Sequence, residues 1–298
     1  MILGSPSRLY SKTPTRERPK PQMCHSSHQQ KKDNKFRSLG TPDKIWAVSA
    51  IHGDCTRLEG LHNAIYERIN VGDRLVYLGN YTGHGEQSRE VIDELLTFRR
   101  ALLALPGMKP SDITYLRGGQ EEMLHLLTQL QFCREPVDTL LWMLGSGMSN
   151  TMRSYGICPH EGITAAREGI MSLTRWTNKI KEQLRNQAGF DAFMMNHMRA
   201  AYTEYQTDKM ALFVNAGLDP SLTLEQQEDR LWWQGDNFHD MHGAYKPFEK
   251  VIRGFDPKHQ GVQMNGVTAS LDGGCGFGGS LICAGMEATG DIFELMEA

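Results

Sequence analysis

Five short loops, each containing at least one glycine, follow apolar runs along this 298-residue chain. The runs are short and rich in β-branched or aromatic side chains, which is typical of buried strands. A strand, a loop and a helix then repeat in that order, and this order predicts an α/β layer structure. The loops cover residues 49–53, 79–85, 117–121, 214–217 and 253–257.

Strands and helices alternate in the first half of the predicted domain. Apolar residues from Leu58 to Ile69 recur at helical spacing and predict an amphipathic helix. We expect strands over residues 45–51, 73–78 and 112–116, with helices over residues 56–70, 88–105 and 121–132. The closing part is predicted to be mostly β, with strands over residues 210–215, 250–253, 262–271, 280–286 and 292–295.

The stretch between these two parts is rich in methionine and poor in β-branched runs. We predict a helical insertion over residues 135–207. Methionine adapts to varied shapes, so its Met and aromatic residues are candidates to line a ligand groove. Core packing is the commoner role for such residues, and we favour it here.

Residues 1–40 carry many more basic than acidic side chains and few large apolar ones. Such a segment cannot offset the entropy of ordering, so we predict a disordered basic tail, followed by one domain over residues 41–298. A solvated tail, or an upstream extension if translation starts at Met23, is favoured over an arm that contacts nucleic acid, anionic lipid or an acidic partner. We expect no membrane span and a cytoplasmic protein.

The five loops resemble, in order, the G-D-x-H-G, G-D-x-x-D-R-G, R-G-N-H-E, H-A-G and G-H-T motifs of calcineurin-like metallophosphoesterases. From about residue 44 onward the chain is similar to the bacterial serine/threonine protein phosphatases and dinucleoside tetraphosphate hydrolases of that family. The resemblance implies a four-layer α/β/β/α sandwich of two mixed sheets, with the loops meeting at its edge. The sequence outside the motifs also resembles that family at residues 213–220, 231–233 and 272–279.

In that family the loops hold two divalent ions that activate a water for attack on phosphorus. A carboxylate that bridges the ions offsets their mutual repulsion, and neutral ligands do this poorly. The resemblance implies that His52 is the only family ligand retained here. The other ligand positions are replaced by Ala50, Asn80, Gly119, Asn215 and Phe255.

The residues that assist catalysis in that family are also replaced in this chain. The proton donor to the leaving group corresponds to Gln120, which cannot supply a proton. The aspartate that orients this donor and the arginine that grips phosphate correspond to Gly83 and His84. The resemblance therefore implies loss of the ancestral reaction.

We predict a pseudophosphatase: a metallophosphoesterase-fold protein that acts as a binding or regulatory module, with no metal and no cofactor. Its partner would be an unidentified protein or a phosphorylated ligand. The alternative is a diverged Mn- or Fe-dependent phosphoesterase acting on phosphoprotein or nucleotide esters, rebuilt around His52 with Asp54, His84 and Glu86. Candidate binding residues are His52, Asn80, His84, Arg117 and Arg253. The two arginines could bind an anion, because guanidinium pairs well with phosphate, but we favour a structural salt bridge for them.

Overall fold

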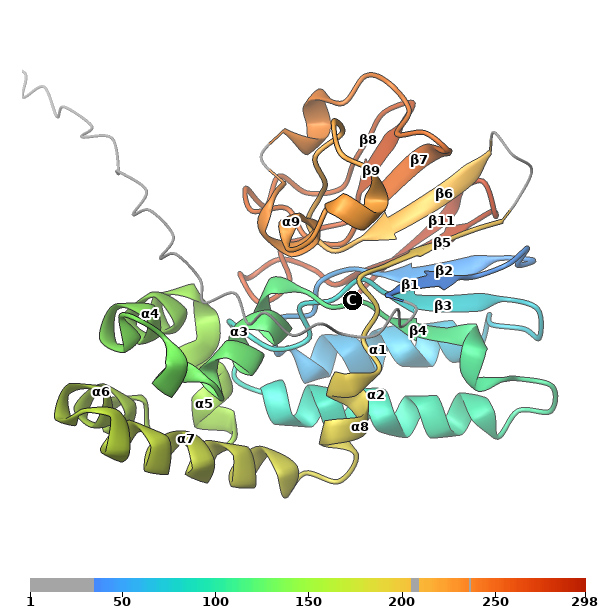
Figure 1. The fold of residues 1–298 in the computed structure, drawn as a ribbon. Helices are drawn as coiled ribbons and strands as arrows, with labels where there is room; N and C mark the ends of the chain where they lie inside the picture. The colour runs from blue at the N-terminus through green and yellow to red at the C-terminus, as the bar shows by residue number, and fades with distance from the viewer. Residues whose placement is uncertain (1–34, 205–208, 236) are drawn as a thin grey trace, which may run out of the picture.

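Two mixed β-sheets lie face to face in the computed structural model, which describes residues 35–204, 209–235 and 237–298 (Figure 1). The five-stranded sheet has the order β11-β10-β2-β3-β4, in which β2, β3 and β4 are parallel and β10 and β11 are antiparallel. Its strands are β2 (Ile45–Val48), β3 (Arg74–Tyr77), β4 (Ile113–Tyr115), β10 (Ile282–Met286) and β11 (Ile292–Glu297).

The second sheet has six strands in the order β1-β5-β6-β7-β9-β8. Its central pair, β6 and β7, is parallel. The strands are β1 (Phe36–Ser38), β5 (Ala200–Tyr202), β6 (Met210–Val214), β7 (Phe248–Arg253), β8 (Gln263–Met264) and β9 (Thr268–Ser270). The single strand predicted over residues 262–271 is thus two short strands joined by a turn at Asn265, whose Oδ1 accepts hydrogen bonds from Val267 N and Thr268 N.

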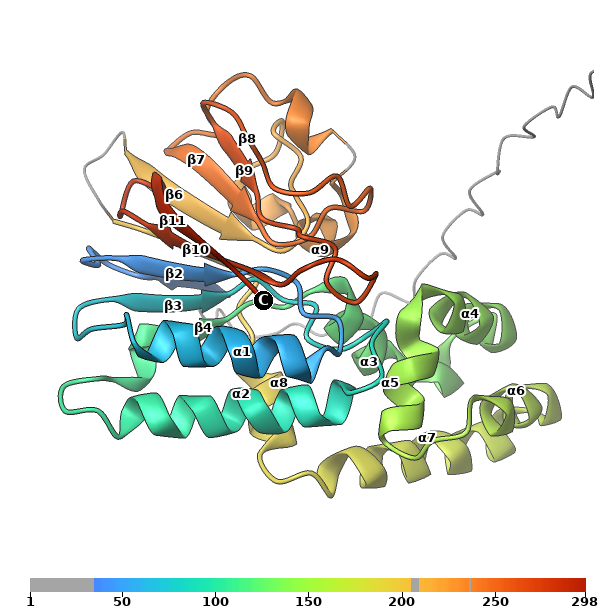
Figure 2. The ribbon, with the colours of Figure 1, turned by 180° about the vertical axis from the view of Figure 1, so that it is seen from behind.

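Successive side chains of β2 point to opposite faces of the sheet and pack in two different hydrophobic cores. Ile45 and Ala47 pack between the sheets, whereas Trp46 and Val48 pack against helices on the outer face. Figure 2 shows α1 (Cys55–Tyr66) and α2 (Ser88–Leu103) running along that outer face. All four side chains are at most 1% exposed, so neither face of this strand meets water.

The outer face of the six-stranded sheet has a thinner cover. It consists of the one-turn helix α9 (Arg230–Trp233), short 3₁₀ turns and the loops between them. Trp232, Phe238 and Tyr245 pack there against Leu212 and Val251. The predicted fold class is confirmed as an α/β structure with two mixed sheets flanked by helices.

The range predicted for the helical insertion contains helices α4 (Pro136–Met143), α5 (Ser149–Ser154), α6 (Pro159–Glu168), α7 (Ile170–Arg185) and α8 (Phe190–Met195). Its Met143, Met148 and Met152 are buried in the core. The helices end at residue 195, and β5 follows inside the range that the sequence assigned to the insertion. Small alanines give β5 no strong strand signal, and it forms because it pairs with β1 and β6. The predicted end of the insertion, at residue 207, lies outside the described residues.

The structured domain also begins earlier than predicted. Phe36–Ser38 form β1, which pairs in parallel with β5, and Leu39 is 2% exposed. The sequence placed these residues in a disordered tail because basic residues surround them, but burial of Leu39 and edge pairing order them. Residues 1–34 of the predicted tail lie outside the described part of the chain. Among the helices of the described residues, none is long and apolar enough to cross a bilayer.

Candidate functional site

The five loops identified in the sequence meet at one edge of the two sheets, because each follows the carboxyl end of a parallel strand. Backbone hydrogen bonds join them across the sheets. Ala50 N donates to Gly254 O at 3.0 Å, and Phe255 N donates to Asn215 O at 2.9 Å. His52 N donates to Asn80 O at 2.8 Å. We call this meeting point, made of residues 50–53, 80–84, 117–121, 215–217 and 253–256, the loop site.

Side chains at the predicted positions lie close together in the loop site. A side chain added at Gly83 would lie 2.9 Å from both His52 Nδ1 and Gln120 Cδ. A side chain added at Gly79 would lie 2.9 Å from Asn215 Nδ2. One added at Gly119 would lie 2.8 Å from the ring of Trp233. Gly83, at φ +132°, therefore leaves no space for the aspartate found there in the resembling family.

Asn80 stands where the resemblance places a bridging carboxylate, and here it joins two loops. Its Oδ1 accepts a hydrogen bond from Gln120 N at 3.1 Å, and its backbone φ is 57°. The left-handed conformation is one that Asn tolerates better than most residues. Asn80 is thus a structural residue of the second and third loops.

Glu121 is a fully buried carboxylate that connects the second and third loops through hydrogen bonds. Its Oε1 accepts from Tyr81 N at 2.9 Å, and its Oε2 accepts from Asn80 N and Gly118 N at 2.9 and 3.0 Å. Burial raises the pKa of the Glu121 carboxyl, and the backbone N–H groups oppose this shift. The carboxylate is therefore committed to backbone donors and does not face the loop site as a ligand.

An aromatic cluster made of His52, His84, Phe255, His259 and Phe277 occupies the loop site. The His52 ring lies 5.4 Å from His84, 5.3 Å from Phe255 and 5.3 Å from Phe277, measured between ring centroids. Phe277 also lies 4.1 Å from His84 and 3.9 Å from His259. Phe277 is 44% exposed, whereas His52 beneath it is 1% exposed.

The His52 ring is neutral because of this burial. Desolvation, helped by nearby His84, lowers the pKa of His52 to about 3. Neither ring nitrogen has a partner at hydrogen-bonding geometry among the described residues, although the Thr82 backbone lies near enough to favour the charged ring slightly. Burial also lowers the pKa of His84.

The donor set of the loop site does not fit a pair of divalent ions. Within the loop site, the buried side-chain oxygens without a partner among the described residues are neutral: Thr82 Oγ1, Gln120 Oε1 and Asn215 Oδ1. No group of three or more His, Cys, Asp or Glu side chains among the described residues has the arrangement to hold a metal. Paired dications need anionic oxygens to offset their repulsion. The two carboxylates of the loop site are engaged elsewhere, Glu121 by backbone N–H groups and Asp256 by Arg253.

The carboxylates predicted for a rebuilt site are used elsewhere or exposed. Asp54 accepts a hydrogen bond from Arg57 N at the start of α1 and pairs with the Arg57 side chain at 3.1 Å. Glu86 is exposed. His84 is the only member of the predicted set that comes next to His52.

Arg253 lies in a buried salt bridge, the role favoured for it from the sequence over binding of an anion. It is fully buried and pairs with Asp256 at 2.9 Å. Its Nε donates to Ser270 Oγ at 3.0 Å and its Nη1 to Gly235 O at 2.9 Å. A buried guanidinium requires such partners, and the sequence offered no sign of which ones it would find.

Arg117 follows β4 and pairs with Glu122 at 2.9 Å, with 28% of its side chain exposed. The structure therefore places it in a salt bridge, which was one of the two roles expected for it. The Trp142 and Trp233 rings lie with their centroids 5.7 Å apart, and the Trp233 ring packs against Gly119 of the third loop. They form an apolar border beside the third loop.

Two members of the aromatic cluster, His259 and Phe277, were missed in the sequence. Phe277 comes from the glycine-rich turn at residues 272–279, where Gly276, at φ +81°, has no space for a side chain because His52 packs against it. His259 is fixed by Asp272, whose Oδ2 lies 2.9 Å from His259 Nδ1. The Gly-rich turn was the only available signal, since it brings backbone close to another segment.

The sequence matches no protein-family model, and no curated protein is significantly similar to it. Solved structures do match. A putative diadenosine tetraphosphatase aligns with a TM-score of 0.54 at 16% identity, over 88% of this chain and 98% of its own. A protein tyrosine phosphatase from a psychrophilic Shewanella species aligns with a TM-score of 0.51 at 12% identity, over 88% of this chain and 83% of its own. A second cold-active protein tyrosine phosphatase structure gives a TM-score of 0.50 at 11% identity, over 90% and 83% of the two chains.

Identities this low establish the fold alone. Over most of its length the chain shares the fold of these proteins, in agreement with the fold that the order of its loop motifs predicted. Shared fold does not decide activity, which depends on the side chains of the site.

Proposed function

We propose that this chain is a pseudophosphatase, which acts by binding a partner protein through the aromatic cluster and the loops around it. The observation that carries the proposal is the filling of the loop site by aromatic and histidine side chains, with His52 buried and neutral beneath Phe277. A hydrolase of this fold needs anionic metal ligands and a proton donor at those positions. Gln120 supplies neither of these, and its Nε2 donates to Ser146 O at 2.8 Å.

The exposed part of the aromatic cluster supports a binding role. Phe277 is 44% exposed in the middle of rings from three loops. Aromatic side chains are enriched at the centres of protein interfaces, where a few of them provide most of the binding energy. A phosphorylated ligand held by Arg253 is not part of the proposal, because that guanidinium is buried and paired.

Turnover measurements test the absence of catalysis. The purified protein is incubated with an aryl phosphate and Mn²⁺ or Fe²⁺, with His52→Ala as the matched variant. We expect the same background rate for both proteins. Metal-dependent turnover that His52→Ala abolishes would instead support the diverged phosphoesterase, for which the gathering of His52, His84 and His259 is the one favourable observation.

Crosslinking in the native cell tests the binding role. Phe277→Ser and Phe293→Ser are matched variants, because each of these phenylalanines is 44% exposed. Phe277 belongs to the aromatic cluster, while Phe293 lies on β11 and packs against Trp46. We expect one crosslinked partner to be lost only with Phe277→Ser. Equal retention with both variants would remove the aromatic cluster as the binding surface.

A further inference from the structure

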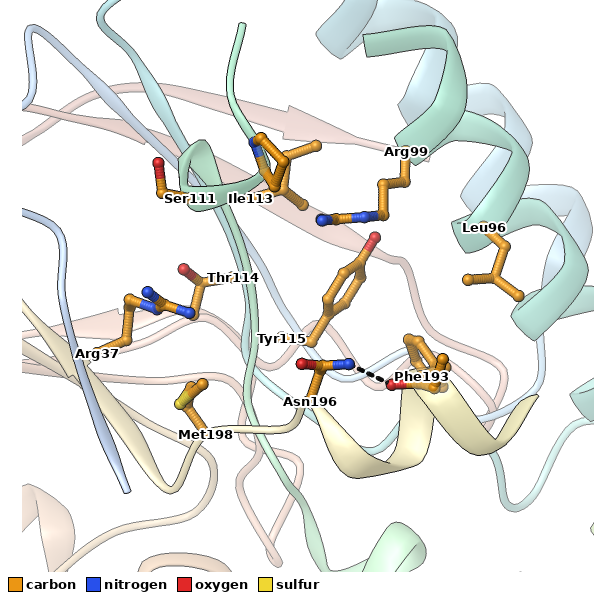
Figure 3. A pocket seen from close by; sticks show the side chains of 12 residues that line it. Arg37, Leu96, Arg99, Ser111, Ile113, Thr114, Tyr115, Phe193, Asn196 and Met198 are labelled. Carbon is orange, nitrogen blue, oxygen red and sulfur yellow. Dashed lines mark hydrogen bonds between the residues drawn. The ribbon is translucent and has the colours of Figure 1, made fainter. Parts of the chain in front are cut away.

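A cavity of about 390 Å³ lies beside the edge strand β4, away from the loop site. Figure 3 shows side chains from β1, α2, β4 and α8 arranged around this space. Its volume falls in the range of small-molecule sites. The lining residues used below are Arg37, Arg99, Thr114, Tyr115, Phe193 and Met198.

Both charged residues that line the cavity are arginines. Arg37 comes from β1 and Arg99 from α2, and no acidic side chain is among the lining residues. The Arg37 guanidinium makes no ion pair or hydrogen bond with any other residue that the structure describes, and Arg99 lies at the Tyr115 hydroxyl. The chain as a whole has a formal net charge of -3, so this concentration of positive charge is local. Guanidinium groups of this kind pair well with phosphate and carboxylate.

Thr114 contributes a hydroxyl without a partner. The residue is 3% exposed, and its Oγ1 has no hydrogen bond to the described part of the chain. Buried polar groups nearly always have a partner, so an unpaired hydroxyl in a cavity wall indicates that a ligand or water completes it. In Figure 3 the Thr114 side chain and the Arg37 guanidinium lie on the same side of β4.

The other side of the cavity is apolar. The Tyr115 and Phe193 rings meet edge to face with their centroids 5.1 Å apart, and Leu96 and Met198 also line the space. Such walls accept a ring or a short alkyl group. The cavity therefore combines positive charge and a free hydroxyl with an apolar surface.

We propose that this cavity binds a small organic anion in which an apolar ring carries a phosphate or a carboxylate. The anionic group pairs with Arg37 and accepts a hydrogen bond from Thr114 Oγ1, while Arg99, at the Tyr115 hydroxyl across β4, adds positive charge to the same cavity. The ring packs against Phe193 and Met198. This site is independent of the proposed pseudophosphatase role, because the two share no residue.

Calorimetric titrations of the full chain test the proposal with four probes: phenyl phosphate, benzoate, inorganic phosphate and benzyl alcohol. We expect saturable binding of phenyl phosphate or benzoate with a Kd below about 1 mM, and at least about tenfold weaker binding of the two probes that lack either the ring or the charge. The stronger of the first two probes identifies the anion. No saturation by either one up to about 10 mM would overturn the proposal.

Three variants connect binding to the cavity. Arg37→Gln should weaken binding about tenfold or more, since it removes a charge-assisted hydrogen bond, and Arg99→Gln should weaken binding by a smaller factor, since it removes a positive charge from the other side of the cavity. Arg100→Gln is the matched control, because Arg100 is the next residue on α2, is exposed and bonds Thr97 Oγ1 at 3.0 Å. Arg37 has no described partner to lose, so its variant stays informative even if Arg99→Gln fails to fold. Unchanged affinity in Arg37→Gln, or an equal loss in Arg100→Gln, would refute the assignment.

Discussion

Replacement of Glu121 by Gln is the sharpest test of how the loop site is held. The Glu121 carboxylate accepts three hydrogen bonds of 2.9 to 3.0 Å from Tyr81 N, Asn80 N and Gly118 N. A longer one comes from Thr82 N at 3.4 Å. A glutamine offers one oxygen, so its NH₂ group must face at least one of these donors. The substitution removes the negative charge and leaves backbone N–H groups without an acceptor in a site that excludes water.

The expected loss follows from these contacts. Each buried donor without a partner costs about 1–3 kcal/mol. One strong bond is lost if the NH₂ group takes the place of Oε1, and two are lost if it takes the place of Oε2. We therefore expect Glu121→Gln to lower the free energy of unfolding by about 3 kcal/mol. Urea denaturation followed by tryptophan fluorescence measures this, with an unchanged m-value if the transition stays two-state.

Glu122→Gln provides the matched control at the next residue. Glu122 pairs with Arg117 at 2.9 Å near the surface, and loss of such a pair costs about 1 kcal/mol or less. A Glu121→Gln effect no larger than that of Glu122→Gln would show that the buried carboxylate does not bind the loops together.

Two further predictions concern buried charge and acid. Arg253→Met leaves the Asp256 carboxylate buried without its 2.9 Å partner, so we expect a loss of about 3–5 kcal/mol that a second change, Asp256→Asn, partly reverses in a double-mutant cycle. The pKa of His52 is about 3 in the folded chain, whereas its ordinary value is 6.5. Between pH 6.5 and pH 3 only the unfolded chain binds a proton at this residue, so the free energy of unfolding decreases as the pH is lowered through this range. From pH 7 to pH 5 this group should contribute about 2 kcal/mol to the loss, so the loss should be smaller by about that amount in His52→Asn, a variant that tolerates the His52 backbone φ of 51°. His197, whose pKa burial also lowers to about 3, adds to the loss in both proteins. Phe255→Leu, beside the same ring, should lower stability at every pH without reducing this slope, and a slope as steep in His52→Asn as in the native protein would contradict the reasoning.

The arrangement of the loops could be predicted from the sequence because it depends on local signals. Apolar runs predicted β2, β3 and β6, and the glycines after them marked where each chain segment turns. The order of the motifs then implied that Asn80, Gln120 and Asn215 come together. The structure places all three at the loop site.

The contacts that decide the chemistry could not be predicted in this way. Phe277 reaches His52 from a turn more than 200 residues further along the chain, and no sequence periodicity encodes that contact. Arg253 ends β7 as a charged residue, and only the folded chain shows that Asp256, Ser270 and Gly235 enclose it. The strand β1 was hidden because Phe36 and Leu39 stand among basic residues.

Metal stoichiometry in the loop site tests the central claim most directly. The full chain is equilibrated with Mn²⁺ or Fe²⁺ under anaerobic conditions, freed of loosely held ions, and analysed by mass spectrometry of the metal alongside crystals that locate the metal by anomalous scattering. Neutral amides and a buried imidazole predict well under about 0.1 ion per chain and no anomalous peak beside His52. Two peaks about 3.5–4 Å apart at the loop site, with close to two ions per chain, would contradict the account.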